Sequence, residues 1–388
     1  MYDFDSVINR RNTDSIKWNV KENELPMWVA DMDFPAAPEI INALRDRLRF
    51  PVFGYGRPDD QWYDAYINWW KKYHGLEMKR QHLLFCSGVV PAISSIVRHL
   101  TEPGDKIVLL TPNYNHFYNC IRDNARLPLE VEMIFDGNRY SIDFYCLEKA
   151  LSESSAKLMI ICNPQNPTGT VWEKHELQKI GELCVKYDTL IVSDEIHCDI
   201  ITPGMKYVPY SSVSELNRKN SITCIAPTKA FNLAGLHTSA LYIPDDNLRK
   251  QTDAAINKDE IAMPNSFAAE AARAAFTKGR QWLDELNEYI YHNKQIVMKF
   301  LQTELPEIRL LWGDATYLLW LDCSALGMDS KMLSAQIRKC TGLYVMAGSY
   351  YGKGGEAFLR MNIACPQTLL LDGLLRLKKA VSVIKKID

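Results

Sequence analysis

The middle of this 388-residue chain alternates between short apolar segments and amphipathic ones, and this alternation constrains the fold more than any other feature. Several apolar segments have the length and composition of β-strands: 106–110, 158–162, 190–193, 222–226 and 239–243. Residues 175–187, between two of these strands, have the periodicity of an amphipathic helix. Strands that alternate with helices form mainly parallel sheets with helices on both faces. The sequence therefore predicts an α/β fold of this kind.

The C-terminal third follows a different pattern, with a long helical stretch at 281–301 and short strands near 317–321 and 358–363. The chain is also longer than one hydrophobic core usually supports. We therefore expect a second, smaller α+β domain. The predicted division is an N-terminal segment that packs with the small domain, a large domain and the small domain: 1–44, 45–275 and 276–388.

Composition excludes several classes of function. The chain has 45 basic and 47 acidic residues and a net charge of −2, which gives no electrostatic basis for binding nucleic acid or an anionic membrane. No apolar run approaches the roughly 20 residues that span a bilayer. Residues 1–5 lack the features of a secretory signal. None of the ten cysteines forms a C-x-x-C pair, so we expect reduced thiols in a cytoplasmic protein, without disulfides or a metal site.

Polar side chains follow three of the predicted strands within a few residues. Asn166, Asp194 and Lys229 supply an amide, a carboxylate and an amine. In open parallel sheets, ligands bind beyond the carboxyl ends of the strands, so these groups should converge. An amine for a Schiff base, a carboxylate for a pyridinium nitrogen and an amide for a phenolic oxygen are the groups that pyridoxal phosphate (PLP) requires. The sequence therefore predicts a PLP site.

Each of these residues also has a simpler explanation. Asp194 alone would more often be a helix N-cap, and Lys229 alone a surface lysine. The apolar strand before Lys229 and Phe231 after it favour a desolvated, reactive amine, and this lysine changes the interpretation of Asp194. Glu195 and Asp199 are expected to be solvated or to support the site from outside.

A phosphate group needs backbone N–H groups at the start of a helix. Gly88, Val89 and Val90 come directly before Pro91 and an apolar-periodic helix that extends to Leu100. This segment is a candidate phosphate site, and the alternative is an ordinary turn.

Further candidates for the site are scattered along the chain. Arg360 lies within an apolar run, where a buried guanidinium could bind a substrate carboxylate or form an internal salt bridge. Tyr55 and Tyr114 lie in turn contexts, where each could stack on a ring or serve in packing. His197 and His237 are expected near the site, although histidines are often satisfied core residues.

Together these residues identify a family. The motifs at 166–169 (Asn-Pro-Thr-Gly), 193–197 (Ser-Asp-Glu-Ile-His) and 231–236 (Phe-Asn-Leu-Ala-Gly-Leu) resemble those of fold-type I PLP enzymes, the class I/II aminotransferase superfamily, over nearly the full length. Segments 28–34 and 53–55 are similar to the cystathionine β-lyase branch, the MalY/PatB group of cysteine C–S lyases. The resemblance implies a seven-stranded sheet with helices on both faces, plus a smaller α+β domain.

The resemblance also implies a role for each candidate. Lys229 would carry PLP, Asp194 would pair with the pyridine nitrogen, and Tyr114 would stack on the ring. Asn166 and His197 would approach the phenolic oxygen. The implied phosphate ligands are Gly88, Val89, Val90, Thr228 and Tyr55 of a second subunit of a homodimer. The implied substrate contacts are Arg360, Asn166 and the backbone of Ala30.

Two positions depart from the family pattern. Relatives commonly have serine three positions before the lysine, where this chain has Ala226. Many aminotransferases have arginine eight positions after it, where this chain has His237. Both departures affect the expected phosphate contacts.

The function implied by the resemblance is a β-lyase that acts on a small amino-acid substrate, L-cystathionine or a cysteine-type compound. Lys229 would remove the Cα proton, a thiol would leave from Cβ, and pyruvate and ammonia would follow. Either Lys229 or Tyr114 would protonate the sulfur. Two alternatives stay open: an aminotransferase on the same scaffold, and a regulatory protein that binds PLP and a partner.

Overall fold

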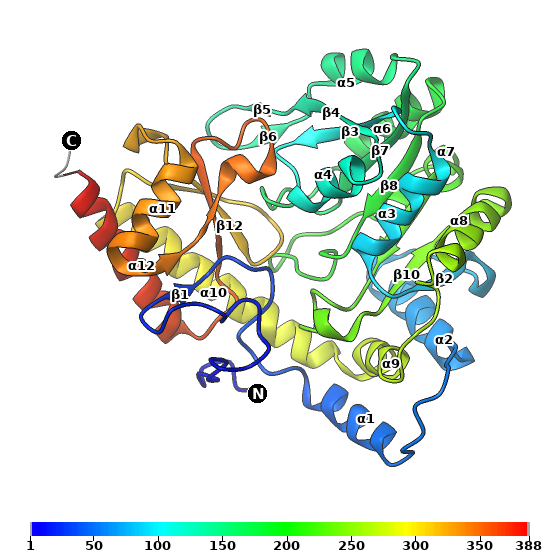
Figure 1. The fold of residues 1–388 in the computed structure, drawn as a ribbon, viewed down its shortest axis with the longest axis horizontal. Coiled ribbons are helices and arrows are strands. Elements are labelled where there is room, and N and C mark those ends of the chain that lie inside the picture. Colours follow the sequence, from blue (N-terminus) through cyan, green and yellow to red (C-terminus); the bar gives the residue numbers. More distant parts are fainter. Residues whose placement is uncertain (1, 386–388) are drawn as a thin grey trace.

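A seven-stranded sheet forms the centre of the larger part of the computed structural model, which describes residues 2–385 (Figure 1). The strand order is β2–β10–β9–β8–β7–β3–β4. The strand bounds are Leu83–Cys86 (β2), Lys106–Thr111 (β3), Leu127–Glu132 (β4), Ala156–Cys162 (β7), Leu190–Asp194 (β8), Ser221–Ile225 (β9) and Ser239–Tyr242 (β10). The five strands β9, β8, β7, β3 and β4 are parallel to one another. Strand β10 is antiparallel to both of its neighbours, β2 and β9. The mainly parallel sheet predicted from the sequence is confirmed.

Helices cover both faces of this sheet because its central strands are apolar on both sides. In β3, Ile107 and Leu109 pack into one core with α3, α4 and α8, while Val108 and Leu110 pack into another with α5 and α6. Successive residues of a strand point to opposite faces, which explains the division. The helix bounds are Val89–Leu100 (α3), Asn115–Arg122 (α4), Phe144–Leu151 (α5), Lys174–Lys186 (α6), Glu215–Lys219 (α7) and Asp246–Lys258 (α8).

A second, four-stranded antiparallel sheet lies in the C-terminal part of the chain, in the order β11–β12–β15–β14 (Figure 1). The bounds are Arg309–Leu311 (β11), Leu318–Asp322 (β12), Met346–Ala347 (β14) and Phe358–Asn362 (β15). The accompanying helices are Arg280–Glu304 (α10), Ser330–Thr341 (α11) and Gln367–Ile384 (α12). The small α+β part of the fold is therefore present, whereas the exact domain boundaries stay predictions.

The N-terminal segment joins the C-terminal part through β1 (Leu25–Pro26), which pairs in parallel with β13 (Leu343–Tyr344). From there the chain continues into α1 (Pro38–Leu48) and α2 (Asp60–Trp69), and both helices contact α9 (Ala268–Lys278). The remaining elements are the hairpin of Ile134–Phe135 (β5) and Tyr140–Ser141 (β6) and the short turns Arg80–His82 (η2), Tyr210–Ser212 (η3), Ala234–Leu236 (η4), Ser324–Leu326 (η5) and Gly348–Tyr351 (η6).

The helical segment from Asp60 to His74 has two parts in the structure. After α2 the chain forms a π-helical turn, Trp70–His74 (η1), and Gly75 ends it with a φ of 67°. Glycine adopts this left-handed conformation without a Cβ clash, which suits Gly75 to end the helix. None of the helices within residues 2–385 combines the length and the apolar character needed to cross a membrane.

Candidate active site

Three neighbouring strands bring the predicted amide, carboxylate and amine to one edge of the large sheet. Asp194 is the last residue of β8 and is 4% exposed. Asn166 lies in the loop after β7 and Lys229 in the turn after β9. Because β7, β8 and β9 are adjacent and parallel, their carboxyl ends lie side by side. The convergence expected from the sequence is present.

The amine of Lys229 is held by a backbone oxygen from the N-terminal segment. Its Nζ donates a hydrogen bond of 2.8 Å to the carbonyl oxygen of Ala30. The hydroxyl of Tyr317, on the approach to β12, donates to the same oxygen at 3.0 Å. Burial and, to a lesser extent, the charge of Arg360 lower the pKa of Lys229 to about 8, against the opposing influence of Asp31 and Asp194. The amine is therefore far easier to deprotonate than an ordinary lysine.

Asp194 is a buried carboxyl group without a cationic partner in contact. Burial raises the pKa of Asp194 to about 7, while the backbone N–H of Ile196, which donates at 3.2 Å, and the charge of Lys229 act in the opposite direction. Within residues 2–385 no lysine, arginine or histidine forms a salt bridge with it. A carboxylate in this setting is stabilised by a ligand that brings its own positive charge.

Arg360 lies in the middle of β15 and is 3% exposed. Its Nη1 donates to Asn166 Oδ1 at 3.2 Å, and its Nη2 donates to the carbonyl oxygen of Trp28 at 2.9 Å. The guanidinium also lies 4.9 Å from the ring centre of Tyr351. Among the described residues no carboxylate pairs with this guanidinium, and its Nε has no hydrogen-bond partner. The internal salt bridge considered from the sequence is therefore wrong, and the charge is available to an acidic ligand.

The side chains of His197 and Tyr114 also lie near Arg360. His197 is 4% exposed, and its Nδ1 has no hydrogen-bond partner among the described residues. Burial and, to a lesser extent, the charges of Lys229 and Arg360 lower its pKa to about 3. His197 is therefore neutral at physiological pH. Tyr114 is half-buried at the start of α4, and burial raises the pKa of its hydroxyl, which stays protonated.

The candidate phosphate segment begins α3, as the sequence predicts. Gly88 is the N-cap residue, and no side chain caps the first helical turn that contains Val89 and Val90. A Cβ on Gly88 would lie 3.2 Å from Cδ of Pro91, closer than most such contacts. Thr228 is half-buried in the lysine turn. The free N–H groups of the turn form an anion-binding end of the helix.

The two positions that depart from the family pattern lie in different settings. Ala226 is 1% exposed at the end of β9, so a methyl group replaces the expected hydroxyl inside the core. His237 is exposed and adopts a left-handed φ of 50° after η4.

Tyr55 is the candidate that this single chain does not bring to the site. Its side chain is 98% exposed in the segment between α1 and α2, at the periphery of the molecule in Figure 1. Three apolar neighbours in that segment, Phe50, Val52 and Phe53, are also exposed. Exposed apolar residues gathered in one segment are typical of a contact surface.

Of the two alternatives expected for Glu195 and Asp199, solvation is excluded by their burial, whereas a supporting position outside the site is compatible with it. Glu195 is 0% exposed and accepts hydrogen bonds from Ser193, Asn163 and the backbone N–H of Tyr210. Asp199 is 6% exposed, and its Oδ1 contacts the indole nitrogen of Trp69 and Nε2 of His74 at 2.9 Å. Both carboxylates fasten the segment that follows β8.

A cavity of about 970 Å³ lies elsewhere, between the first residues of the chain, η1 and α10. It contains none of the predicted site residues. His74, Cys198 and Asp199 lie together at its wall, but the Asp199 oxygen nearest His74 already accepts two hydrogen bonds. The convergence of reactive groups, rather than cavity size, therefore locates the candidate active site.

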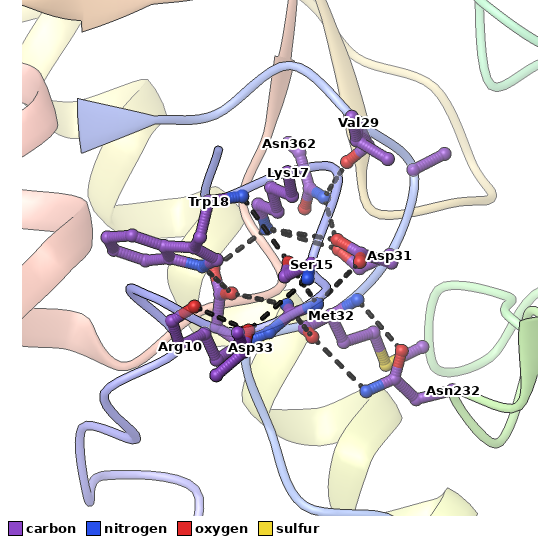
Figure 2. Close-up of polar contacts among 12 residues, drawn as sticks. Arg10, Ser15, Lys17, Trp18, Val29, Asp31, Met32, Asp33, Asn232 and Asn362 are labelled. Carbon is purple, nitrogen blue, oxygen red and sulfur yellow. Dashed lines mark hydrogen bonds and ion pairs between the residues drawn. The ribbon is translucent and has the colours of Figure 1, made fainter. Parts of the chain in front are cut away.

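Sequence reasoning missed several residues of the site. His116 lies beside Tyr114, with ring centres 5.1 Å apart, and burial together with the charges of Lys229 and Arg360 lowers its pKa. Asn232 and Asn362 bind the segment that carries Ala30 (Figure 2). The two asparagines follow Lys229 and Arg360 closely in the sequence, which is the one signal that could have indicated them.

The residues present fit PLP. A buried carboxyl group lacks a cation, a neutral histidine has a free ring nitrogen, and an uncapped helix start is available for an anion. The lysine amine has a lowered pKa, as a group that bonds covalently to an aldehyde requires.

The chain matches the family of class I and II aminotransferases over residues 23–376. It belongs to this family. It is 42% identical to the cystathionine β-lyase PatB of Bacillus subtilis over 386 residues, which cover 98% of this chain and 100% of that protein.

Solved structures agree with the family assignment. Cystalysin from Treponema denticola, which contains PLP, has a TM-score of 0.95 and 33% identity, with 100% of both chains covered. The PLP-bound C–S lyase from Staphylococcus hominis has a TM-score of 0.93 and 32% identity, with 98% of both chains covered. The predicted family, the predicted fold and the PLP dependence of the family are confirmed.

Proposed function

We propose that this protein is a PLP-dependent carbon–sulfur β-lyase that cleaves L-cystathionine or a related cysteine-type amino acid to a thiol, pyruvate and ammonia. The observation that carries the proposal is the buried Arg360, which has no carboxylate partner within residues 2–385, in the same space as Lys229 and Asp194. An unpaired guanidinium can bind the carboxylate of an amino-acid substrate, next to the lysine and the carboxyl group of the site. The 42% identity to a cystathionine β-lyase favours elimination over amino transfer.

The cofactor would be held by residues from three strand ends and one helix. Lys229 would bind it covalently, Asp194 would pair with the ring nitrogen, and Asn166 and His197 would approach the phenolic oxygen. Tyr114 would stack on the ring. The proposed phosphate contacts are Gly88, Val89, Val90, Thr228 and Tyr55 of the partner subunit. Bound PLP supplies an electron sink for the charge that develops at Cα of the substrate.

The protein's own residues supply binding and proton transfer. Arg360 binds the substrate carboxylate through a fork of N–H groups, together with the Asn166 side chain and the Ala30 backbone. Once the amino group of the substrate has replaced Lys229 on the cofactor, the freed Nζ, with a pKa near 8, would accept the Cα proton. Asp194 would stay ionised next to the ring nitrogen of bound PLP, because a positive charge there would offset the cost of its burial.

Loss of the thiol requires a proton for the departing sulfur. Tyr114 can donate it because burial keeps its hydroxyl protonated. Lys229 can donate the proton it has just removed from Cα. These two residues are the proposed catalytic groups, and the remaining three-carbon fragment then hydrolyses to pyruvate and ammonia.

We also propose a homodimer in which Tyr55 completes the site of the neighbouring subunit. Tyr55 is almost fully exposed beside exposed Phe50 and Val52, which is unusual for an isolated monomer. A cytoplasmic location is supported by the ten cysteines, all of which are free thiols.

The proposal is tested by incubating the PLP-loaded protein with L-cystathionine, with and without an added keto acid. We expect pyruvate and ammonia to form at the same rate in both reactions. Lys229→Ala should abolish the reaction, whereas Lys258→Ala, at an exposed lysine of α8, should not change it. Turnover that depends strictly on the keto acid would support the aminotransferase alternative instead.

A further inference from the structure

Residues 28–34, here called the strap, contribute two hydrogen-bond acceptors to the site. The Ala30 carbonyl accepts from Lys229 Nζ at 2.8 Å, and the Trp28 carbonyl accepts from Arg360 Nη2 at 2.9 Å. The strap itself contains no helix or strand. Its position therefore depends on side chains that bind it from outside.

One of these side chains is on the lysine turn. Asn232, three positions after Lys229, accepts a hydrogen bond from the Met32 N–H at 3.0 Å. Its Nδ2 donates to the carbonyl oxygens of Met32 at 3.1 Å and Phe34 at 3.0 Å. The turn that presents the reactive lysine thus also fixes the C-terminal half of the strap.

A second asparagine is on the arginine strand. Asn362, two positions after Arg360 in β15, donates through Nδ2 to the carbonyl oxygens of Val29 and Asp31, both at 2.6 Å. The backbone N–H of Asn362 also donates to Met27 at 2.9 Å. The strand that presents the substrate-binding arginine thus fixes the N-terminal half of the strap.

The strap also carries two carboxylates, which are neutralised by two cations in a partly buried cluster of charges (Figure 2). Lys17, 1% exposed, lies 2.7 Å from Asp33 and 3.7 Å from Asp31. Arg10 lies 2.8 Å from Asp31 and 2.9 Å from Asp33. The indole N–H of Trp18 donates to Asp33 at 2.7 Å. Removing Lys17 would leave Arg10 to neutralise both Asp31 and Asp33, and the partly buried cluster would then carry one excess negative charge, which favours a shift of the strap.

We propose that Lys17 is a positioning residue for the active site, and that the charge cluster of Arg10, Lys17, Asp31 and Asp33 holds the strap in register with Lys229 and Arg360. The kinetic consequence rests on the proposed function. If the strap shifts, the guanidinium loses the Trp28 oxygen that orients it, and the lysine amine loses the Ala30 oxygen. A shift of about 1 Å in such groups can cost up to 100-fold in rate.

The test compares Lys17→Met with Lys106→Met in the PLP-loaded protein. Both substitutions remove a paired lysine and keep a long apolar side chain, but Lys106 pairs with Glu153 at the start of β3, outside the strap cluster. For Lys17→Met we expect amide hydrogen exchange in residues 29–34 to be at least about tenfold faster. We also expect KM for L-cystathionine to rise about tenfold or more, with a smaller change in kcat. Lys106→Met should change neither quantity.

Two further variants keep the inference falsifiable. Lys17→Arg retains the charge and should restore most of the protection and of KM. Asn232→Ala removes hydrogen bonds to the strap without leaving a buried charge unpaired. It therefore provides the same test of the strap's position if Lys17→Met does not fold. Unchanged exchange in the strap, or faster exchange with unchanged KM, would overturn the proposal. If the native protein does not cleave L-cystathionine, the proposed function fails, while hydrogen exchange still reports on the strap.

Discussion

Lys229 Nζ and the carbonyl oxygen of Ala30 are joined by a 2.8 Å hydrogen bond, although 199 positions separate the two residues. The sheet presents the lysine, and the N-terminal segment supplies its acceptor. The Tyr317 hydroxyl, from the C-terminal part, donates to the same oxygen. The site is therefore complete only when three distant parts of the chain have come together.

The first prediction concerns the covalent attachment of the cofactor. The purified protein should be yellow, and borohydride should attach PLP irreversibly to Lys229, because this amine has a pKa lowered to about 8 by burial. Peptide mass mapping identifies the modified residue. A cofactor found on another lysine, such as Lys294, would contradict the site assignment.

The second prediction concerns Arg360. Arg360→Ala should lower kcat/KM by the equivalent of about 2–5 kcal/mol, because the substrate carboxylate loses a buried, charged partner. Arg360→Lys should recover part of this loss, since it keeps the charge but not the fork. The absorbance of bound PLP should be unchanged in both variants. The matched control is Arg139→Ala, an exposed arginine for which no change is expected.

The third prediction concerns the stability of the PLP-free protein. Burial raises the pKa of Asp194 to about 7 in the folded state, against about 3.9 in unfolded chains. Between these values the folded protein binds more protons than the unfolded one, so stability falls as pH rises from 4 to 7. Above pH 7 the full cost of ionising this buried group, roughly 4 kcal/mol at most, is present.

Asp194→Asn should therefore make the PLP-free protein more stable at pH 8 and leave it unchanged at pH 4. Urea unfolding at the two pH values measures the difference. Asp123→Asn, at an exposed position, is the control. Equal stability of Asp194→Asn and the native protein at both pH values would show that Asp194 is not desolvated. The stabilised variant should nevertheless retain PLP poorly, because the ring nitrogen loses its carboxylate.

The fourth prediction concerns the dimer. Tyr55→Ala and Lys229→Ala should each be nearly inactive, but mixing them under conditions of subunit exchange should restore activity. One of the two sites in a mixed dimer then has both residues intact, which gives roughly a quarter of native activity after statistical exchange. No recovery, despite exchange demonstrated by mass spectrometry, would place Tyr55 outside the neighbouring site.

The sequence by itself determined which reactive side chains lie at the carboxyl ends of the strands. Asn166, Asp194 and Lys229 follow apolar runs of strand length, and parallel strands end at one edge of a sheet, so the pattern was enough to predict their convergence. Residues 106–110 were identified as a strand because local hydrophobicity marks buried strands. The strand Leu127–Glu132 was missed, since it contains Pro128 and two glutamates and depends on its neighbour for pairing.

Only the tertiary structure decided which groups are buried and what they contact. The sequence left open whether Glu195 is solvated or supports the site, and the structure shows it fully enclosed, with hydrogen bonds from Ser193, Asn163 and Tyr210. Arg360 could have formed a salt bridge, and its partners turned out to be an amide and a backbone oxygen. No local pattern in the sequence indicated that Lys17 is buried or that it pairs with Asp31 and Asp33. Burial and pairing over hundreds of residues follow from long-range packing, which no local pattern of side chains encodes.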